Sequence, residues 1–473
     1  MTGITGRRAP SGRQIRGLAL PPHRASTRDL QAVYPWMADA GLPATGQLVG
    51  HNMLGGGTFA HDPWDWYAAG ITTNPNGMVF GEIGSRKSTF AKCMIARGYE
   101  FGRDAFVTDV KHEYTDLAAH LGYEPIFLGP GLPARLNPFD PGPAGFDDPA
   151  ATQERQLAML VALGVAVLGR TLSQAELTVC AIAIAELTGA DLQPGEAGAE
   201  LRPAAGRARV PVLPEVIDVL KHPPQRQVAK LPIDRDELRT ATADLIMGML
   251  RLVDGDLKGM FDEPTNIDLP PDARFVVVNL SRVREERRAA LPLVRICATS
   301  WLQAALARRD GRRRFVVADE AWDDMTIGTL RWYQSMFKLT RQYLASNWLI
   351  FHKPGDLLTA GDAGTASARL AESLIADTGT IVLYRQKPQQ LDLCRSYFAV
   401  NDAESRWLTR LNPGQALWKV GNRAHLVQHL RAATEATFTD TEPTTPTVSG
   451  DPASGTDAGG IDTDHADAAG EAP

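Results

Sequence analysis

The stretch Gly81-Glu82-Ile83-Gly84-Ser85-Arg86-Lys87-Ser88-Thr89 decides the fold that this sequence predicts. It follows the apolar run Met78–Phe80 and opens a segment with helical character that extends to Arg97. A glycine-rich loop between a strand and a helix is typical of a P-loop, which binds a nucleoside triphosphate. Backbone N–H groups of such a loop point at phosphate oxygens, Lys87 reaches the β- and γ-phosphates, and the Ser88 hydroxyl binds Mg²⁺. All nine residues are therefore candidates for nucleotide binding.

The loop departs from the usual pattern G-x-x-x-x-G-K-[ST] at one position. Arg86 stands where the second glycine is expected. A side chain at this position crowds the phosphates, changes the backbone dihedral angles of the loop, or adds a positive charge beside the phosphates. The alternative to nucleotide binding is a glycine-rich turn that precedes a helix.

A second motif lies far along the chain. The apolar run Phe315–Ala318 ends in two acids, Asp319 and Glu320. At the carboxyl end of a parallel strand, side chains face the crevice that binds ligands. Asp319 is then placed to hold Mg²⁺ together with Ser88, and Glu320 to orient or deprotonate the attacking water. The structural alternative is helix capping, because acids favour the first turn of a helix.

Short apolar runs rich in β-branched residues alternate with helical patterns in the middle of the chain. The alternation predicts a mostly parallel sheet with helices on both faces. The expected strands are Met78–Phe80, Ala105–Thr108, Phe275–Leu280, Phe315–Ala318, Trp348–Phe351 and Thr380–Tyr384. Two of these strands lie in the chain between the P-loop strand and the strand before Asp319. An added strand between those two marks the RecA-like class, so the predicted fold is an α/β, RecA-like P-loop NTPase.

The segment 149–257 interrupts the alternation of strands and helices. It predicts an all-α insertion, in which Ser173 and Glu176 form a capping box. Helical periodicity occurs over four stretches, Glu154–Gly169, Ser173–Thr188, Leu213–Lys221 and Arg235–Val253. The NTPase core is then divided into a first part, 29–148, and a second part, 258–433.

Charge is segregated toward the two ends of the chain. Residues 1–28 carry six arginines and no acid, which predicts a disordered basic arm. Residues 434–473 are rich in Thr, Asp, Gly, Ala and Pro and predict a disordered acidic tail. The full chain has a net charge of −6, and the nine acids after Arg431 contribute more negative charge than this. The rest of the chain therefore has a net positive charge. A basic arm suits a phosphate backbone or a lipid surface, and its alternative is a solvated face.

Several classes of protein are disfavoured by composition. The longest apolar run, Leu157–Leu168, is shorter than the roughly 20 residues that span a membrane, and no secretory signal opens the chain. The four cysteines lie far apart, as in proteins of a reducing cytosol. The ten histidines show no metal-ligand spacing. Mg²⁺ is therefore expected only with the nucleotide, and ATP is favoured because no NKxD-type guanine motif occurs.

The order of the motifs resembles the ATPase domain of the conjugative type IV secretion ATPases, within the HerA/FtsK superfamily of P-loop motors. The resemblance spans about residues 70–425 and the Ala-, Arg- and Gly-rich composition favours an actinobacterial member. It rests on the P-loop and on Asp109–Tyr114, Leu136–Asp140, Phe261–Ile267, Asp319–Trp322 and Leu411–Trp418.

The resemblance implies an Mg²⁺-dependent ATPase motor, commonly a homo-hexamer, that is cytoplasmic and docks at the inner face of the membrane. Implied partners are the membrane proteins of the secretion channel and a relaxase or DNA. His352 stands where motors of the superfamily often have a glutamine that senses the γ-phosphate. Arg341 and Arg385 are candidates for an arginine finger from a neighbouring subunit. The structural alternatives are strand-end packing for His352 and surface ion pairs for the two arginines.

Two further questions stay open at this point. Asp109 and Glu113 follow an expected strand, where they either support the water or metal or cap a helix. The rival functions are a nucleotide-binding scaffold that does not hydrolyse, which Arg86 motivates, and a double-stranded DNA translocase.

Overall fold

The protein is described here from a computed structural model. It describes residues 42–43, 45–141, 149–195, 198–202, 209–230, 234–255, 257–267, 269–270, 272–306, 311–358 and 366–440. The expected basic arm, 1–28, lies outside these residues, as does the expected acidic tail from residue 441 onward. The start of that expected tail, 434–440, is ordered instead, because it contains a helix (Ala436–Thr439) and Glu435 forms an ion pair with Arg97 at 2.6 Å.

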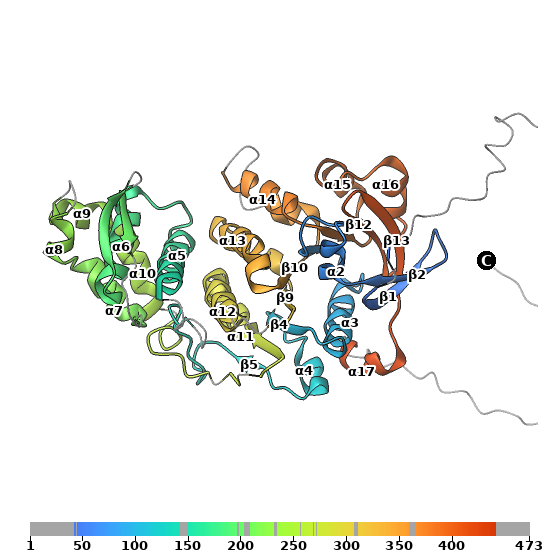
Figure 1. The fold of residues 1–473 in the computed structure, drawn as a ribbon, viewed down its shortest axis with the longest axis horizontal. Coiled ribbons are helices and arrows are strands. Elements are labelled where there is room, and N and C mark those ends of the chain that lie inside the picture. Colours follow the sequence, from blue (N-terminus) through green and yellow to red (C-terminus); the bar gives the residue numbers. More distant parts are fainter. Residues whose placement is uncertain are drawn as a thin grey trace, which may run out of the picture.

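An eleven-stranded sheet forms the centre of the molecule, in the order β2-β1-β13-β12-β11-β3-β10-β9-β4-β8-β5 (Figure 1). The strands from β11 to β5 in this order pair in parallel, and those from β12 to β2 pair antiparallel. The bounds are β1 (Gln47–Asn52), β2 (Thr58–His61), β3 (Gly77–Phe80), β4 (Asp104–Asp109), β5 (Ile126–Phe127), β8 (Phe275–Asn279), β9 (Arg314–Ala318), β10 (Ala345–Phe351), β11 (Thr380–Leu383), β12 (Gln415–Val420) and β13 (Arg423–His429).

The six expected strands are confirmed as β3, β4, β8, β9, β10 and β11, and all six are parallel. The strand that separates the P-loop strand β3 from β9 is β10. It follows both of them in the chain, whereas the two expected strands that lie between them in the sequence, β4 and β8, are on the far side of β9. The RecA-like arrangement is confirmed, but a different strand produces it.

Both faces of the parallel strands are buried, which explains their unbroken apolar runs. In β3, Met78 and Phe80 belong to one hydrophobic cluster and Val79 to the other, as the two-residue period of a strand requires. The helices that cover the sheet and its edges are α2 (Pro63–Ala68), α3 (Lys87–Glu100), α4 (Thr115–Leu121), α11 (Ser281–Glu286), α12 (Leu291–Leu306), α13 (Ile327–Tyr343), α14 (Ala366–Ala376), α15 (Leu391–Phe398), α16 (Asp402–Leu408) and α17 (Ala436–Thr439).

The inserted segment lies at one end of the molecule, in green in Figure 1. Its elements are α5 (Pro149–Leu168), α6 (Gln174–Thr188), β6 (Asp191–Gly195), β7 (Gly198–Arg202), α7 (Leu213–Lys221), α8 (Gln225–Val228), α9 (Arg235–Ala241) and α10 (Ala243–Asp254). The antiparallel pair β6 and β7 corrects the prediction that this segment is all-α. Proline and glycine at Pro194 and Gly195 hide β6 from a search for strand patterns, because both are depleted in strands.

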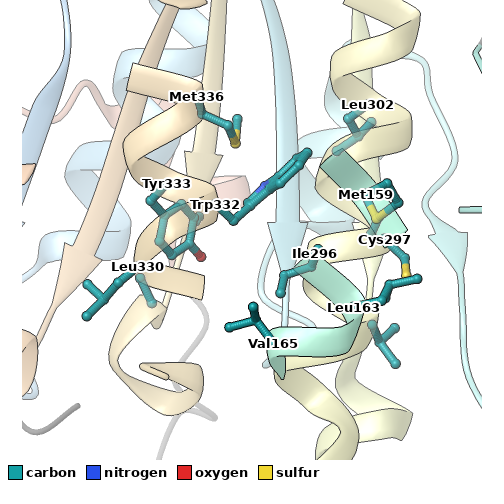
Figure 2. Close-up of a cluster of buried hydrophobic side chains, with 14 of the residues drawn as sticks. Met159, Leu163, Val165, Ile296, Cys297, Leu302, Leu330, Trp332, Tyr333 and Met336 are labelled. Atoms are coloured by element: carbon teal, nitrogen blue, oxygen red, sulfur yellow. The ribbon is translucent and has the colours of Figure 1, made fainter. Parts of the chain in front are cut away.

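The insertion and the sheet share one hydrophobic cluster. Figure 2 shows Met159 and Leu163 of α5 beside Ile296 and Cys297 of α12, with Trp332 of α13 on the other side. The inserted helices are therefore anchored on the two helices that flank β9, the strand that carries the acidic pair.

Candidate functional site

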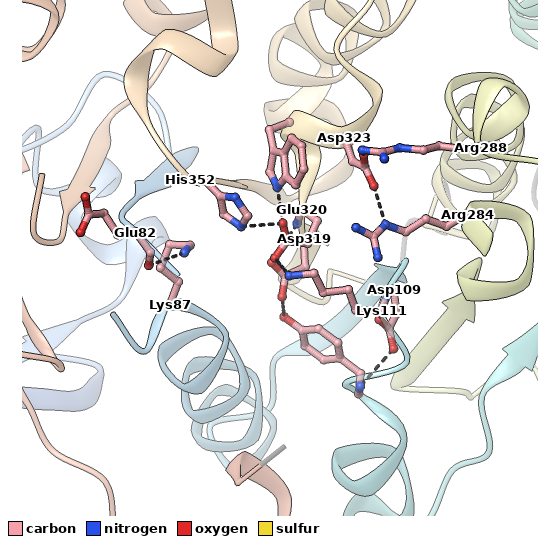
Figure 3. A network of polar contacts seen from close by, with 12 residues as sticks. Glu82, Lys87, Asp109, Lys111, Arg284, Arg288, Asp319, Glu320, Asp323 and His352 are labelled. Carbon is pink, nitrogen blue, oxygen red and sulfur yellow. Dashed lines mark hydrogen bonds and ion pairs between the residues drawn. The ribbon is translucent and has the colours of Figure 1, made fainter. Parts of the chain in front are cut away.

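The site lies at the carboxyl ends of four neighbouring parallel strands. β10 pairs with β3 on one side and with β9 on the other, and β9 pairs with β4. Because parallel strands end at the same edge of a sheet, the residues that follow them meet there. The P-loop follows β3, Asp319 follows β9, His352 follows β10, and Lys111 follows β4 (Figure 3).

The P-loop has the close backbone packing that its glycines predict. A Cβ atom on Gly81 would lie 2.5 Å from the Cβ of Tyr384 and 2.7 Å from the Ser85 Oγ, so no side chain fits there. Gly84 has a φ of 78°, in the left-handed region where glycine is favoured. The backbone N–H of Ser85 donates to the Glu82 carbonyl at 3.2 Å and closes the loop.

Arg86 adopts the backbone conformation of the glycine it replaces. Its φ is 73° and its ψ is 33°, and it is the N-cap of α3. The exposed side chain runs toward the turn at Gly414, where an added Cβ would lie 3.8 Å from the Arg86 Cδ. Arg86 therefore keeps the dihedral angles that the loop needs, at a cost in backbone strain of about 1 kcal/mol.

Lys87 begins α3 and points into the crevice. Its ammonium group donates to the Glu82 carbonyl at 3.0 Å, and only 6% of the residue is exposed. Burial lowers the pKa of Lys87, while the negative charges of Glu320 and Asp319 oppose this and the positive charge of Lys111 adds to it. The lysine of the P-loop and the acidic pair thus act on one another in a single crevice.

Asp319 is fully enclosed by polar partners. The Tyr114 hydroxyl donates to its Oδ2 at 2.9 Å, and the backbone N–H of Glu320 donates to its Oδ1 at 2.8 Å. Burial, followed by the charges of Glu320 and Glu113, raises the pKa of Asp319 to about 6. A carboxylate that is destabilised by burial and by like charges is a favourable ligand for a cation.

Glu320 is held by three hydrogen-bond donors. Lys111 pairs with its Oε1, the Trp322 indole donates to its Oε2, and the His352 Nε2 lies 2.8 Å from the same Oε2. Burial alone would raise the pKa of Glu320, but the hydrogen bonds from His352 and Lys111 outweigh it and lower the pKa to about 2. The residue has a φ of 53°, so its backbone is also in the left-handed region.

The loop after β4 supplies two contacts that sequence reasoning missed. Asp109 accepts hydrogen bonds from the backbone N–H groups of Lys111 and Tyr114, each at 3.0 Å. Its carboxylate therefore fixes this loop and is not directed at a metal. The loop in turn brings Lys111 to Glu320 and Tyr114 to Asp319. The sequence signal that could have found this loop is Asp109 at the end of an expected strand. Asp commonly accepts hydrogen bonds from backbone N–H groups a few residues further along the chain, and so fixes a turn.

The candidate sensor and finger residues have different positions. His352 contacts Glu320, so it lies in the site. Arg385 is exposed, two residues after the end of β11. Arg341 lies in α13, and its side chain is outside the part of the chain that the structure describes. Ser88 and Thr89 lie in the first turn of α3, beside Lys87.

Two of the motifs behind the family resemblance bind each other. The backbone N–H of Arg135 donates to the Asn266 side chain at 2.7 Å, and that of Asn137 donates to the Thr265 hydroxyl at 3.0 Å. A third motif supports the P-loop, since the Gly414 N–H donates to the Ser85 carbonyl at 3.2 Å. These motifs are therefore structural parts around the site.

Other kinds of site were sought in the described residues. No cluster of three or more His, Cys, Asp or Glu suited to a metal occurs among them. All four cysteines are described, and each is buried and free. Of the helices in the described ranges, none combines the length and the apolar character needed to cross a membrane.

Solved structures with a similar fold were found. The chain superimposes on VirB4 of Thermoanaerobacter pseudethanolicus with a TM-score of 0.63 and 19% identity, over 84% of this chain and all of the other. The plasmid coupling protein TrwB in complex with ADP and Mg²⁺ has a TM-score of 0.48 and 13% identity, over 76% of this chain and 86% of TrwB. No protein-family model matches the chain, and no curated protein matches it. The chain therefore has the RecA-like fold of VirB4.

The side chains of the crevice fit a magnesium-bound triphosphate. Lys87 carries a positive charge, the first turn of α3 has no side-chain cap on its N–H groups, and Ser88 and Asp319 carry oxygen atoms of the kind that Mg²⁺ prefers. Glu320 follows Asp319 and carries a buried carboxylate.

Proposed function

We propose that this protein is an Mg²⁺-dependent ATPase that serves as a motor in a conjugative or type IV secretion system, where it energises transfer or channel assembly. The observation that carries the proposal is the placement of Lys87 after β3 and of Asp319 and Glu320 after β9 at the same edge of the sheet, where both strands pair with β10 (Figure 3). The shared fold with VirB4 supports the biological setting.

In this mechanism the P-loop residues Gly81–Thr89 bind the triphosphate, and Lys87 neutralises oxygens of the β- and γ-phosphates. Ser88 and Asp319 would hold Mg²⁺, which withdraws charge from the same oxygens when it is bound. Glu320 accepts a proton from water as the water oxygen bonds to the γ-phosphorus. The bond to the β–γ bridging oxygen breaks, and the electron pair leaves with ADP.

The assembly that we propose is a homo-hexamer in the cytoplasm, peripheral to the membrane and in contact with channel proteins. A relaxase or DNA is the transported partner. Arg385 is a candidate finger because it is exposed next to the carboxyl end of β11, where a neighbouring subunit could receive it. Arg341 stays a second candidate, and His352 is a candidate sensor through its contact with Glu320.

The proposal is tested with Glu320→Gln and Lys87→Ala. In Glu320→Gln the general base is lost while the P-loop is intact, so we expect ATP to bind and hydrolysis to fall by about 100-fold or more. In Lys87→Ala we expect both binding and hydrolysis to be lost. Phosphate release and equilibrium binding of labelled ATP measure the two quantities.

The outcome also separates a motor from a scaffold. Three donors hold Glu320 in this structure, which is the observation that favours a scaffold. If the wild-type protein binds ATP but releases no phosphate at any concentration that allows assembly, the scaffold replaces the motor. If Glu320→Gln hydrolyses ATP at the wild-type rate, Glu320 is not the base.

A further inference from the structure

We propose that Lys111 is a positioning residue that exchanges partners: it holds Glu320 while the site is empty and moves to the γ-phosphate when a triphosphate binds. The inference rests on the proposed function and adds to it how the site distinguishes ATP from ADP. Lys111 follows β4 and is neither in the P-loop nor in the acidic motif.

The geometry of Glu320 carries the first step of this inference. Both of its carboxylate oxygens are engaged, Oε1 by Lys111 and Oε2 by Trp322 and His352 (Figure 3). A carboxylate that is paired with an ammonium group and two N–H donors is a poor acceptor for a proton from water. Hydrolysis therefore requires that at least one of these partners leaves.

Lys111 is the partner best able to leave. Its side chain is 28% exposed, whereas the Glu320 side chain is 5% exposed, so the ammonium group enters the crevice from the solvent side. The ring of Trp322 packs at a tilt of 34° against that of His352, with 4.7 Å between ring centroids, and the His352 side chain is 18% exposed. A flexible lysine stem at the rim can change its direction without any movement of the sheet.

The triphosphate supplies the reason for Lys111 to move. The general base lies within one water molecule of the γ-phosphorus, so a lysine in contact with that base is one side-chain movement from the phosphate oxygens. The charged groups placed with Lys111 are Glu320, which it contacts, and Lys87 of α3, on whose ammonium group the positive charge of Lys111 acts. A γ-phosphate adds negative charge opposite Lys111, whereas ADP leaves that position empty.

The loop that carries Lys111 is fixed at both of its ends. Asp109 binds the N–H groups of Lys111 and Tyr114, and the Tyr114 hydroxyl binds Asp319. The backbone of the loop is thus held to the acidic pair, and the mobile part is the side chain of Lys111. This predicts a local exchange in place of a movement of the whole loop.

The experiment uses ¹⁹F NMR of the full chain labelled with 5-fluorotryptophan. The chain has nine tryptophans, so the resonance of Trp322 is assigned by its loss in Trp322→Phe. In the wild type we expect this resonance to shift more with Mg²⁺ and a non-hydrolysable ATP analogue than with Mg²⁺ and ADP. In Lys111→Met without nucleotide, we expect the Trp322 resonance at a different chemical shift from that of the wild type. The difference between the shifts caused by the ATP analogue and by ADP should shrink by about half or more.

Affinities provide a second readout that does not need hydrolysis. The preference for the ATP analogue over ADP should fall about tenfold in Lys111→Met, with the affinity for ADP unchanged. Lys230→Met is the matched control, because it removes a lysine from an ion pair with Asp191 in the insertion and should behave as the wild type. Lys111→Arg keeps the charge and should retain most of the preference. Lys111→Gln, which removes the charge but stays polar at this partly exposed position, replaces Lys111→Met if that variant does not fold.

A Trp322 resonance that responds to both nucleotides in Lys111→Met as it does in the wild type overturns the exchange, and so does an unchanged affinity ratio. Failure of the proposed function looks different, since the wild type would then bind neither nucleotide. In that case the nucleotide-free resonance still decides whether Lys111 contacts Glu320: equal resonances in Lys111→Met and Lys230→Met would reject the contact.

Discussion

At the scale of single residues, the P-loop shows which of its pattern positions are fixed by backbone geometry. Gly81 has no room for a Cβ, whereas Arg86 occupies a glycine position with its side chain in solvent. The second glycine of the pattern is thus needed for its positive φ and not for space. An arginine can adopt this φ at a modest cost, so Arg86 by itself gives no reason to expect a disabled loop.

The first prediction follows from this position. Arg86→Gly removes the strain of about 1 kcal/mol but adds a similar entropy to the unfolded chain, so the free energy of unfolding should change by less than about 0.5 kcal/mol. Arg86→Val should lose about 1–2 kcal/mol, because a β-branched residue is disfavoured at positive φ. Urea denaturation of both variants measures the difference. Equal stabilities of the glycine and valine variants would show that the backbone at residue 86 is not left-handed.

The residues of the site were predictable to different degrees. Lys87, Asp319 and Glu320 were found because their motifs have fixed spacing next to apolar strands. Lys111 and Tyr114 belong to the motif Asp109–Tyr114, in which the sequence predicted roles only for the carboxylates Asp109 and Glu113, because acids are the usual metal ligands. What the two residues contact depends on the neighbouring strands β4 and β9, and strand order across a sheet is not written in local patterns.

At the scale of elements, local signals were most reliable where a helix begins. The capping box expected at Ser173 is present: its hydroxyl accepts from the Glu176 N–H at 3.3 Å, and the Glu176 carboxylate accepts from the Ser173 N–H at 2.7 Å. Arg170 also binds this carboxylate, at 2.8 Å. By contrast, the stretch expected as one helix from Arg235 to Val253 is broken at Thr242, whose hydroxyl bonds to the Leu238 carbonyl at 2.9 Å.

This capping box gives the second prediction. Ser173→Ala removes the acceptor of one N–H group at the start of α6, so the free energy of unfolding should fall by about 1 kcal/mol. Ser173→Thr keeps an acceptor and should lose only a small part of that. Urea denaturation followed by circular dichroism makes the comparison. If the alanine and threonine variants are equally stable, the box does not contribute to the stability of α6.

The order of strands shows what sequence reasoning lacks at this scale. Six of the seven parallel strands were placed and the two-residue strand β5 was missed, while the strand that separates β3 from β9 was assigned to the wrong part of the chain. A run such as Trp348–Phe351 shows that a strand exists, but its neighbours depend on connections that cross the sheet. The antiparallel strands β12 and β13 were also missed. Each has a buried run of only three residues, Ala416–Trp418 and His425–Val427, and polar side chains such as Lys419 and Gln428 follow these runs.

At the scale of the whole molecule, the N-terminal hairpin is joined to the NTPase core through a histidine. His61 ends β2 and is fully buried, with its ring 4.7 Å from that of Trp66, 5.4 Å from Trp348 of β10 and 5.3 Å from Trp418 of β12. Neither ring nitrogen has a hydrogen-bond partner among the residues that the structure describes. The ring therefore packs as an apolar group that connects the hairpin, α2 and two strands of the sheet.

The burial of His61 has a consequence for the pH dependence of folding. Burial lowers the pKa of His61 to about 4, while the neighbouring Asp62 opposes the shift only in part. Between pH 6.5 and about 4 the unfolded chain binds a proton at this histidine and the native protein does not, so stability falls as the pH falls through this window. The loss from this one group approaches about 3 kcal/mol at pH 4, and above pH 6.5 it vanishes.

The third prediction isolates this loss with His61→Leu, which fills a similar volume and cannot titrate. Its unfolding free energy should depend less on pH than that of the wild type. Between pH 7 and pH 4, the unfolding free energy of the wild type should fall by about 3 kcal/mol more than that of His61→Leu. Urea denaturation at a series of pH values measures both curves. His51→Leu is the control, because His51 of β1 is exposed and its replacement should leave the pH dependence of the wild type. If the unfolding free energies of the wild type and His61→Leu depend on pH in the same way, the ring is hydrated in the native protein. The hairpin would then not be tightly packed against the sheet.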